Sequence, residues 1–311
     1  MTAASPPRTS APAPHASAST IPASALDVPA PALNVPARAA SSRRYVLCRP
    51  DHFEVTYAIN PWMDPAAPVD RARALAQWEI LRATLEAHGH TVETVPGEPG
   101  LPDMVFAANS GIVIGGHALS ARFAHPERAA EGPAFHRWFA ARELRELAAA
   151  AETNEGEGDF AFAGQRILAG VGFRCSLSAH AEVVRFFGIP VVSLELVDPR
   201  FYHLDTALMV LDDATIAYYP AAFSPAAREV LTALYPDAIL ADDNDAVSFG
   251  LNGLSDGEHV FLDPGATGLI AQLRERGFVP VPVDMSELRK GGGGVKCCVL
   301  ELHTRRDTTA G

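Results

Sequence analysis

The chain is poor in cysteine, which excludes two common kinds of site and scaffold. Only Cys48, Cys175, Cys297 and Cys298 occur among 311 residues, without the density of a disulfide framework or the Cys-x-x-Cys spacing of a zinc site. The eleven histidines are scattered as well. We therefore expect no bound metal or cofactor and, since adjacent cysteines rarely bridge each other, a reducing, cytoplasmic compartment.

Basic residues and long apolar runs are also scarce. The 25 Lys and Arg residues are outnumbered by 37 Asp and Glu residues, which gives a formal net charge of -12. A nucleic-acid partner normally calls for clustered positive charge, so none is expected. No run approaches the roughly 18 apolar residues of a membrane span. With 48% hydrophobic and 20% charged residues, the composition is that of a soluble globular protein.

The first 43 residues have almost no aromatic side chains and consist mainly of Ala, Pro and Ser. Such a segment cannot bury enough apolar surface to offset the entropy of ordering. It also lacks the continuous apolar core of a secretory signal. We predict a disordered tail over residues 1–43, a single folded domain over residues 44–305 and a flexible C terminus over residues 306–311.

The hydrophobic pattern of the folded part alternates between short strands and amphipathic helices. Trp78, Leu81 and Leu85, for example, recur at helical spacing between a capping Asp70 and a terminating Gly89. Two strands, a helix and one strand recur about every 50 to 60 residues. This repeat favours an α/β propeller whose strands surround a central channel. A doubly wound sheet is the rival fold, but it predicts single strands between helices.

Three stretches carry predictions that bear on the candidate site. Residues 102–114 are expected to form two strand-like pieces joined through a polar break. Residues 132–151 are expected to form a second helix, and residues 295–302 a closing strand.

A glycine run, Gly291 to Gly294, leads into Cys297 and Cys298. Flexible backbone followed by a cysteine can present a thiol at the mouth of a cavity, although a free cysteine is more often a small core residue. Because side chains alternate along a strand, one of the two should face the cavity while the other packs. Our hypothesis is that Cys297 is a nucleophile and Cys298 its structural neighbour.

A cysteine nucleophile needs a base or proton donor and a group that orients it. Candidates lie in loops at comparable points of successive repeats, where a propeller would bring them together: Asp103 with Asn109, Glu155 to Asp159, His203 with Asp205, and Cys297. Taken singly, each has a structural explanation, such as a turn aspartate or a solvated acidic loop. Acidic groups together with Cys and His suit a cationic, planar substrate.

The same residues carry a resemblance to a known family. The motifs are Asp103-x-Val-Phe-x-x-Asn109, Glu155-Gly-x-Gly-Asp159, Gly172-Phe-Arg174, His203-Leu-Asp205 and Gly-Gly-Val-Lys-Cys297. In this order they resemble the guanidino-group-modifying enzyme superfamily, which includes dimethylargininases, arginine deiminases and dihydrolases, and amidinotransferases. The resemblance covers residues 45–302, essentially the whole folded part.

The resemblance implies a five-bladed α/β propeller with pseudo-fivefold ββαβ repeats and hydrolysis through a covalent thiouronium. Cys297, which follows Gly-Gly-Val-x as in the family, would attack the guanidinium carbon. His203 would protonate the departing amine and then activate water, with Glu155 as its carboxylate partner and Asp159 as the second choice. Positive charge beside a thiol lowers its pKa, so a bound cation favours the thiolate.

The implied substrate is a small guanidino compound, L-arginine or an Nω-methylated arginine. Asp205 would bind guanidinium nitrogens, although the best-known dimethylargininases have a basic residue there. Arg128 and Arg174 stand where relatives hold the amino-acid carboxylate, for which bidentate Arg pairing is suited. Asp103 would contact the guanidinium or support a residue that does. The segment that contains Asn60 resembles a substrate-facing loop of the arginine dihydrolase branch.

Asn109 departs from many relatives, which carry a carboxylate at this position. It resembles instead the arginine dihydrolase branch, in which this residue is associated with the removal of two ammonia molecules. One hydrolytic step would give citrulline and a second would give ornithine. An amidinotransferase would resolve the same thiouronium with an amine, and a non-catalytic arginine-binding protein is a third reading. The sequence leaves the oligomeric state open, a homo-oligomer included.

Overall fold

Strands and helices follow a repeating order through residues 38–304, which the computed structural model describes. Five ββαβ units can be traced in this part of the chain. In each unit the first two strands pair antiparallel, a helix follows, and the third strand pairs parallel with the second. The helix is the crossover connection that a parallel pair requires. The fold is therefore α/β, built from repeated strand pairs as the sequence pattern predicts.

Four of these units follow one another along the chain. The first consists of β3 (Gly111–Ile114), β4 (His117–Ser120), α2 (Glu131–Ala140) and β5 (Glu146–Ala149). The second consists of β6 (Phe160–Ala163), β7 (Arg166–Val171), α3 (Leu177–Phe187) and β8 (Val191–Glu195). The third consists of β9 (Leu208–Val210), β10 (Ile216–Tyr218), α5 (Pro225–Leu234) and β11 (Ile239–Leu240). The fourth consists of β12 (Leu254–Ser255), β13 (His259–Leu262), α7 (Thr267–Glu275) and β14 (Val279–Pro282).

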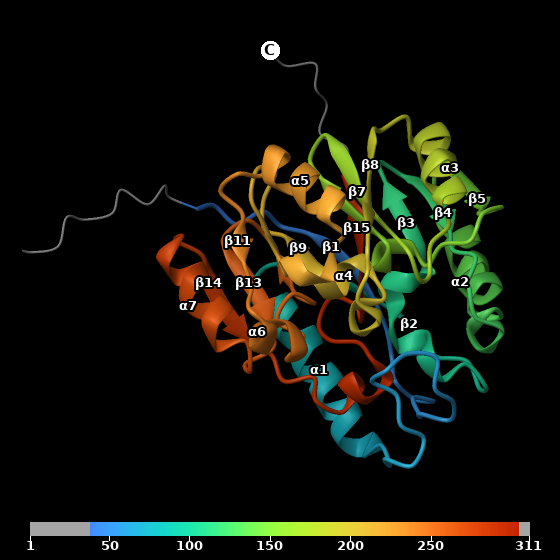
Figure 1. Cartoon of the computed structure of the whole chain (residues 1–311). Coiled ribbons are helices and arrows are strands. Elements are labelled where there is room, and N and C mark those ends of the chain that lie inside the picture. The colour runs from blue at the N-terminus through green and yellow to red at the C-terminus, as the bar shows by residue number, and fades with distance from the viewer. Residues whose placement is uncertain (1–37, 305–311) are drawn as a thin grey trace, which may run out of the picture. The chain divides into compact units, whose positions relative to one another are not determined.

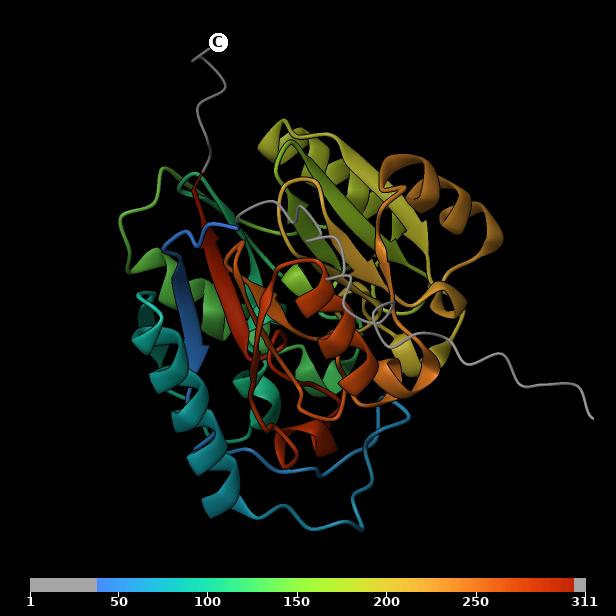
Figure 2. The ribbon, with the colours of Figure 1, turned by 90° about the vertical axis from the view of Figure 1, so that its left-hand side faces the viewer.

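The fifth unit combines segments from both ends of the described chain. It consists of β15 (Val299–His303), β1 (Arg44–Cys48), α1 (Arg71–Ala87) and β2 (Thr91–Val95). β15 pairs antiparallel with β1 and parallel with β3, so the fifth and first units merge into a sheet of order β2-β1-β15-β3-β4-β5. Figures 1 and 2 show β1 and β15 side by side. Two short helices, α4 (Leu204–Ala207) and α6 (Asp243–Val247), lie outside the repeat.

Local sequence signals account for α1. The Asp70 side chain accepts a hydrogen bond from the backbone N–H of Arg73, a cap that contributes about 1 kcal/mol. Trp78, Leu81 and Leu85 are buried, and full burial of such a side chain stabilises the fold by roughly 1.5–3 kcal/mol. The helix thereby covers the sheet that carries β1 and β2.

The predicted helix over residues 132–151 is wrong in its second half. α2 ends at Ala140, and residues 146–149 form β5, which pairs parallel with β4. The Ala- and Glu-rich composition favours a helix, but helix propensity is a weak preference that tertiary pairing overrides. The partner strand β4 has only four residues and gives little local signal.

The predicted first strand in residues 102–114 is also wrong. Pro102–Val105 and Ala107–Ser110 form two short 3₁₀ helices, and only Gly111–Ile114 is a strand. A short apolar run does not by itself distinguish a strand from another buried conformation. The two tight turns place Asp103 and Asn109 in the protein interior.

The closing strand begins later than the sequence suggests. β15 starts at Val299, and Cys297 and Cys298 lie in the turn before it. Strand alternation therefore does not apply to the two cysteines, and both are buried. The turn is stabilised by Asn252, whose Oδ1 accepts from the backbone N–H groups of Gly294 and Cys297.

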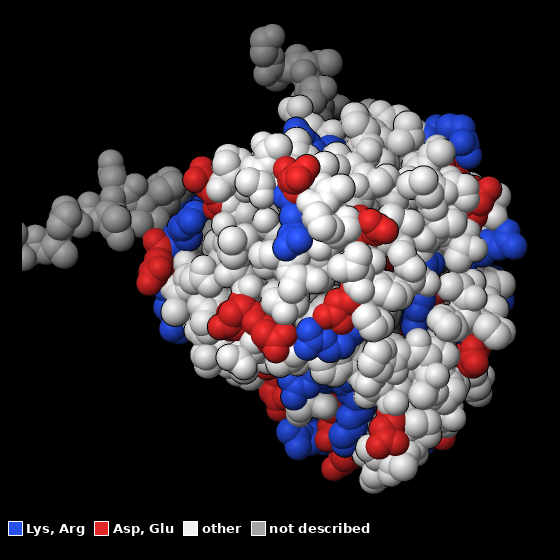
Figure 3. All heavy atoms as spheres, viewed as in Figure 1, with Lys and Arg blue, Asp and Glu red and all other residues white. Residues whose placement is uncertain are grey.

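The predicted tail falls largely outside the described residues, as does the predicted flexible C terminus from residue 306. Residues 38–43 have no regular secondary structure, and the N–H of Ser41 donates to the carbonyl of Asp256. No helix within residues 38–304 is long and apolar enough to cross a membrane. On the face shown in Figure 3, acidic and basic side chains lie interspersed.

Candidate active site

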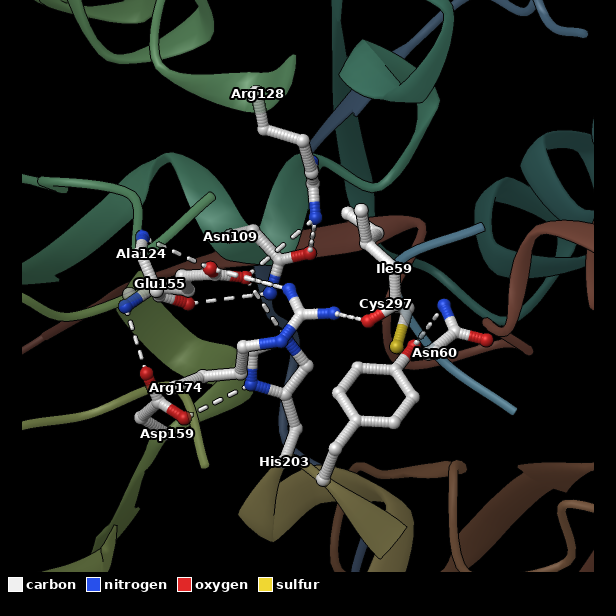
Figure 4. Close-up of polar contacts among 12 residues, drawn as sticks. Ile59, Asn60, Asn109, Ala124, Arg128, Glu155, Asp159, Arg174, His203 and Cys297 are labelled. Carbon is white, nitrogen blue, oxygen red and sulfur yellow. Dashed lines mark hydrogen bonds and ion pairs between the residues drawn. The ribbon is translucent and has the colours of Figure 1, made fainter. Parts of the chain in front are cut away.

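The segments before the first strands of the five units converge on one buried cluster. They lead into β3, β6, β9, β12 and β15, and they supply Asn109, Glu155 with Asp159, His203 with Asp205, Asn252, and Cys297. Figure 4 shows several of these side chains, with Arg174, grouped around the same space. The sequence identifies four of the five loops. Asn252 was missed, although its place before β12 matches that of the other four and is the signal that could have found it.

Cys297 is 2% exposed, and its thiol lies within reach of a carboxylate. Its Sγ donates to Asp205 Oδ2 over 3.2 Å and accepts from Asn252 Nδ2 over 3.1 Å. Burial, followed by the negative charge of Asp205, raises the pKa of the Cys297 thiol well above its ordinary value. In the free protein the sulfur is therefore a protonated thiol, and it needs a positive charge nearby to become a thiolate.

Asn252 holds the cysteine turn in place. Its Oδ1 accepts from the backbone N–H groups of Gly294 and Cys297, over 2.9 and 3.1 Å. Its backbone carbonyl accepts from the N–H of Lys296, and its Nδ2 also donates to the carbonyl of Asp205. One amide side chain thus ties the turn that carries the thiol to α4, which carries its carboxylate partner.

His203 is held by carboxylates at both ring nitrogens. Nδ1 lies 2.8 Å from Asp159 Oδ1 in a hydrogen bond, and Nε2 lies 3.1 Å from Glu155 Oε2 without the alignment of a hydrogen bond. Burial lowers the pKa of His203, but Asp159 and Glu155 outweigh it and raise the pKa to about 9. The imidazole is therefore protonated at neutral pH and able to give up a proton.

Glu155 and Asp159 are coupled to each other as well as to the histidine. The backbone N–H of Glu155 donates to Asp159 Oδ2 over 2.7 Å. The Glu155 carboxylate accepts from Nη1 of Arg174 over 3.0 and 3.2 Å and from the N–H of Ala124. Burial would raise the pKa of Glu155, but His203 and Arg174 hold it well below its usual range. Both carboxylates contact His203, each at a different nitrogen.

The two carboxylate oxygens of Asp205 differ in their surroundings. Oδ2 accepts from the Cys297 thiol, whereas the buried Oδ1 has no hydrogen-bond partner among residues 38–304. Burial raises the pKa of Asp205 to about 6, against the lowering effect of His203 and Lys296. A buried acceptor without a donor is costly, so this oxygen is suited to receive a donor from a ligand.

Arg128 is buried and donates four hydrogen bonds within the protein. Two go to the Glu131 carboxylate, one to Asn109 Oδ1 and one to the carbonyl of Asp103. Burial lowers the pKa of Arg128, but Glu131 and the neighbouring carboxylates raise it well above its ordinary value. Its guanidinium is therefore charged and largely occupied. The assignment of Arg128 to the substrate carboxylate stays a prediction.

Asn109 uses both ends of its amide. Oδ1 accepts from Arg128, and Nδ2 donates to the backbone carbonyl of Glu155 over 3.1 Å. A carboxylate at this position could not make the second bond because it has no donor. Neighbouring Gly158 makes room for this contact, since a Cβ there would lie 2.3 Å from Asn109 Nδ2 and 3.1 Å from His203 Nδ1.

The remaining predicted substrate contacts surround Tyr202. The Arg174 guanidinium carbon lies 4.7 Å from the centre of the Tyr202 ring, and its Nη2 donates to the carbonyl of Ile59. Asn60 Nδ2 donates to the Tyr202 hydroxyl and to the carbonyl of Gly291. The loop around Asn60 thereby lies against the glycine run that leads to the nucleophile candidate.

Two acidic residues of the predicted set differ in how they relate to this cluster. Asp103 is buried, its Oδ2 accepts from the Tyr57 hydroxyl, and its Oδ1 has no hydrogen-bond partner in the described part of the chain. Glu157, which lies between Glu155 and Asp159 in the acidic segment, contacts Lys296 Nζ and His303 Nε2 instead of His203. Within the described residues, no group of three or more His, Cys, Asp or Glu side chains could hold a metal ion.

Comparisons with known proteins identify two groups of relatives among enzymes. No protein-family model matches the chain. The chain is 55% identical over 266 residues to the N(G),N(G)-dimethylarginine dimethylaminohydrolase of Mycobacterium tuberculosis, which covers 86% of this chain and 88% of that protein.

A second group of relatives is cyanobacterial. The chain is 35% identical over 269 residues to the bifunctional arginine dihydrolase/ornithine cyclodeaminase ArgZ of Synechocystis sp., which covers 85% of this chain and 38% of that protein. A crystal structure of the N-terminal domain of ArgZ, covalently bound to a reaction intermediate, matches with a TM-score of 0.81 and 33% identity. This match covers 85% of this chain and 99% of that chain.

Proposed function

This chain belongs to the guanidino-group-modifying enzyme superfamily, and from this premise we propose that it hydrolyses a guanidinium C–N bond of an Nω-methylated arginine through Cys297. The observation that carries the proposal is the buried Cys297 thiol beside Asp205, in the same cluster as a charged His203. The mycobacterial relative supports the choice of a methylated arginine. The chain is thus a hydrolase that acts on C–N bonds in linear amidines.

Recognition of the guanidinium requires acceptors that face its fixed N–H donors. Asp205 and Asp103 each have a buried Oδ1 without a partner among the described residues. Burial raises the pKa of both carboxyl groups. A bound cation would therefore lower the free-energy cost of burying the two carboxylates. We assign these two residues to the guanidinium nitrogens.

For the amino-acid carboxylate we favour Arg174 over Arg128. Arg128 is committed to Glu131 and Asn109, whereas Arg174 lies on Tyr202 beside the loop that contains Asn60. Because Cys297 and His203 are buried, this loop must move to admit a substrate. Arg174 would then exchange part of its pairing with Glu155 for the substrate carboxylate.

The first chemical step forms a thiouronium. The guanidinium charge favours the thiolate, and the thiol proton passes to Asp205 Oδ2 along their hydrogen bond. The sulfur bonds to the guanidinium carbon, and protonated His203 gives its proton to the departing nitrogen as the C–N bond breaks. The neutral amine then takes the proton held by Asp205 and leaves as an ammonium ion.

The second step hydrolyses this adduct. Neutral His203 takes a proton from water, and the resulting hydroxide adds to the thiouronium carbon. The C–S bond then breaks, the hydroxyl proton returns to the sulfur, and citrulline is released. Asp159 keeps the ring oriented through Nδ1 in both steps, so that Nε2 serves as donor and then as acceptor.

We also infer that the five ββαβ units surround a central axis as a five-bladed propeller, and that residues 44–305 form one catalytic domain. The convergence of five equivalent loops on one cluster supports this arrangement, because a radial repeat brings equivalent points of its units together.

Substrate choice is tested by incubating the protein with asymmetric dimethylarginine, L-arginine and agmatine and identifying products by mass spectrometry. We expect citrulline and dimethylamine from the first. Agmatine, which lacks the carboxylate, should react about 10- to 100-fold more slowly, because it loses a charge-assisted pairing with Arg174. Absence of turnover with every guanidino compound would contradict the proposal. Transfer of the amidino group to added glycine or lysine would favour the amidinotransferase alternative.

A second candidate function is the dihydrolysis of L-arginine. The likeness to the arginine dihydrolase ArgZ and the amide at Asn109 both favour it. The same assay separates the two candidates, since dihydrolysis yields ornithine and two equivalents of ammonia from arginine.

We expect kcat/KM to follow a bell-shaped pH profile with limbs near pH 6 and pH 9. Asp205 must be ionised to accept the thiol proton, and burial raises its pKa to about 6, so activity falls as the pH drops below that value. His203 must be protonated, and its pKa is about 9 because Asp159 and Glu155 outweigh burial, so activity falls above it. Initial rates in buffers of constant ionic strength measure both limbs. A profile that keeps rising through pH 10 would contradict the role of His203 as an acid.

A further inference from the structure

The amide of Asn252 fits its surroundings in only one of its two orientations. Its oxygen accepts from the backbone N–H groups of Gly294 and Cys297, over 2.9 and 3.1 Å. If the amide were turned over, its NH₂ group would face these two donors, and an amide nitrogen accepts no hydrogen bond. The nitrogen therefore stays on the opposite side, 3.1 Å from the Cys297 sulfur and 3.1 Å from the carbonyl oxygen of Asp205. Its two hydrogens match these two acceptors.

The main chain of Asn252 is anchored as firmly as its side chain. The residue is fully buried, its N–H donates to the carbonyl of Phe249, and its carbonyl accepts from the N–H of Lys296. The amide therefore presents a fixed N–H donor to the Cys297 sulfur. In a buried site, a donor that is already in place stabilises a developing charge without any cost of reorganisation.

The Cys297 sulfur needs such a donor because its other polar neighbour is a carboxylate. Among the described residues, hydrogen bonds join this sulfur to the side chains of Asn252 and Asp205, and an ionised Asp205 can only accept. Burial and the charge of Asp205 raise the pKa of the thiol, whereas the hydrogen bond from Asn252 acts in the opposite direction. Asn252 thus opposes the effect of the carboxylate on the sulfur.

The two chemical steps differ in the charge that the substrate brings to the sulfur. In the first step the guanidinium is a cation and itself favours the thiolate. In the second step the thiouronium becomes the neutral urea group of citrulline, and Asp205 has already given its proton to the departing amine. The expelled sulfur therefore faces a carboxylate without a cation from the substrate, and the N–H of Asn252 is the donor directed at it.

We propose that Asn252 is a catalytic residue, whose Nδ2–H stabilises the negative charge on the Cys297 sulfur, above all while the C–S bond of the thiouronium breaks. The proposal rests on the function proposed above. The electron pair of the C–S bond passes to the sulfur, and the hydroxyl proton of the adduct follows it. No bond is made to Asn252 and no proton leaves it, so its effect is to shorten the lifetime of the covalent adduct.

Asn252→Asp removes the donor and keeps the acceptor. One carboxylate oxygen can still accept from the N–H groups of Gly294 and Cys297, but the other offers the sulfur no donor. We expect kcat with dimethylarginine to fall about a hundredfold, the usual cost of removing a donor to a developing charge. The thiouronium adduct should accumulate relative to the wild type, because its breakdown slows more than its formation. Mass spectrometry of acid-quenched intact protein measures the adduct.

Asn252→Ala removes the same donor without adding a charge, and it takes the place of Asn252→Asp if that variant does not fold. It also frees the backbone N–H groups of the cysteine turn. A loosened turn would slow the formation of the adduct as well as its breakdown, so accumulation of the adduct reports on the donor in both variants.

Asn154→Asp is the matched control. Asn154 is an equally buried amide, but its oxygen accepts from the N–H of Gly156 and its nitrogen donates to the carbonyl of Glu152. This variant should leave the adduct at the wild-type level.

A second measurement needs no turnover. Alkylation by iodoacetamide at a fixed pH follows the thiolate fraction of Cys297. We expect it to be about tenfold slower in both Asn252 variants, because the thiolate loses a hydrogen bond. Fragment-ion mass spectrometry distinguishes Cys297 from Cys298.

Turnover of Asn252→Asp close to that of the wild type would overturn the proposal, since the amide would then serve only to hold the turn. A fall in kcat without accumulation of the adduct in either variant would overturn it as well, and so would alkylation as fast as in the wild type. A wild-type protein that hydrolyses no guanidino compound, but whose alkylation slows in both variants, would retain Asn252 as the donor to the sulfur and lose the proposed function.

Discussion

Cys297→Ser is expected to lower turnover by about a thousandfold or more while the protein still folds and binds its substrate. The serine hydroxyl has nearly the size of the thiol and can donate to Asp205, so the cluster is kept. A hydroxyl ionises far less readily than a thiol, and the nucleophile is lost. Thermal unfolding checks the fold, calorimetry with dimethylarginine checks binding, and product formation measures the loss.

Cys298→Ser is the matched control for this prediction. Cys298 is equally buried and adjacent in the same turn, but its thiol makes no hydrogen bond to Asp205 or Asn252. We expect turnover within a few-fold of the wild type, with some loss of stability from burying a hydroxyl. Full activity in Cys297→Ser would refute the nucleophile assignment, and loss of activity only in Cys298→Ser would move it to the neighbouring residue.

Asp159→Asn is expected to lower kcat about a hundredfold with little change in KM. Asp159 acts through His203, whose Nδ1 it holds at 2.8 Å, and an amide can keep the distance but not the charge. The pKa of His203, now about 9, should fall toward its ordinary value near 6.5. The alkaline limb of the pH profile should therefore move to lower pH, a change that a merely structural role would not produce.

Glu155→Gln is the comparison variant, because the Glu155 carboxylate contacts His203 as Asp159 does but pairs with Arg174 in addition. Its loss should raise KM as well as lower kcat, since Arg174 would lose the partner that places it beside Tyr202. If Asp159→Asn leaves the alkaline limb at pH 9 while Glu155→Gln shifts it, Glu155 is the residue that governs His203. This pair of variants decides the choice between Glu155 and Asp159 that the sequence leaves open.

Two features of the site could be read from the sequence because they depend on residue type and order. Cys297 after the glycine run and His203 two residues before Asp205 are patterns within short segments, and they point to a site because they occur together with the other motifs in one order. The repeat of strand pairs was also visible, because amphipathic periodicity is a local property. It indicated in advance that loops at equivalent points would meet.

Other features depend on neighbours that are distant in the chain. β5 is a strand although its composition favours a helix, because pairing with the edge of β4 outweighs the local helix propensity. The turn at Cys297 replaced a strand start because Asn252, 45 positions earlier, accepts from its backbone. Neither β4 nor Asn252 can be inferred from the sequence of the segment whose conformation it changes.

The sequence by itself indicated the family, the repeat and the candidates for the reactive side chains, since these follow from residue types at fixed spacings. Only the tertiary structure decided how the side chains pair. It placed Asp159 and Glu155 on opposite nitrogens of His203, directed Glu157 to Lys296, and left one oxygen of Asp205 without a hydrogen-bond partner within residues 38–304. The physical reason is that hydrogen bonds and buried charges are set by distances of about 3 Å between loops of different units, which no local pattern encodes.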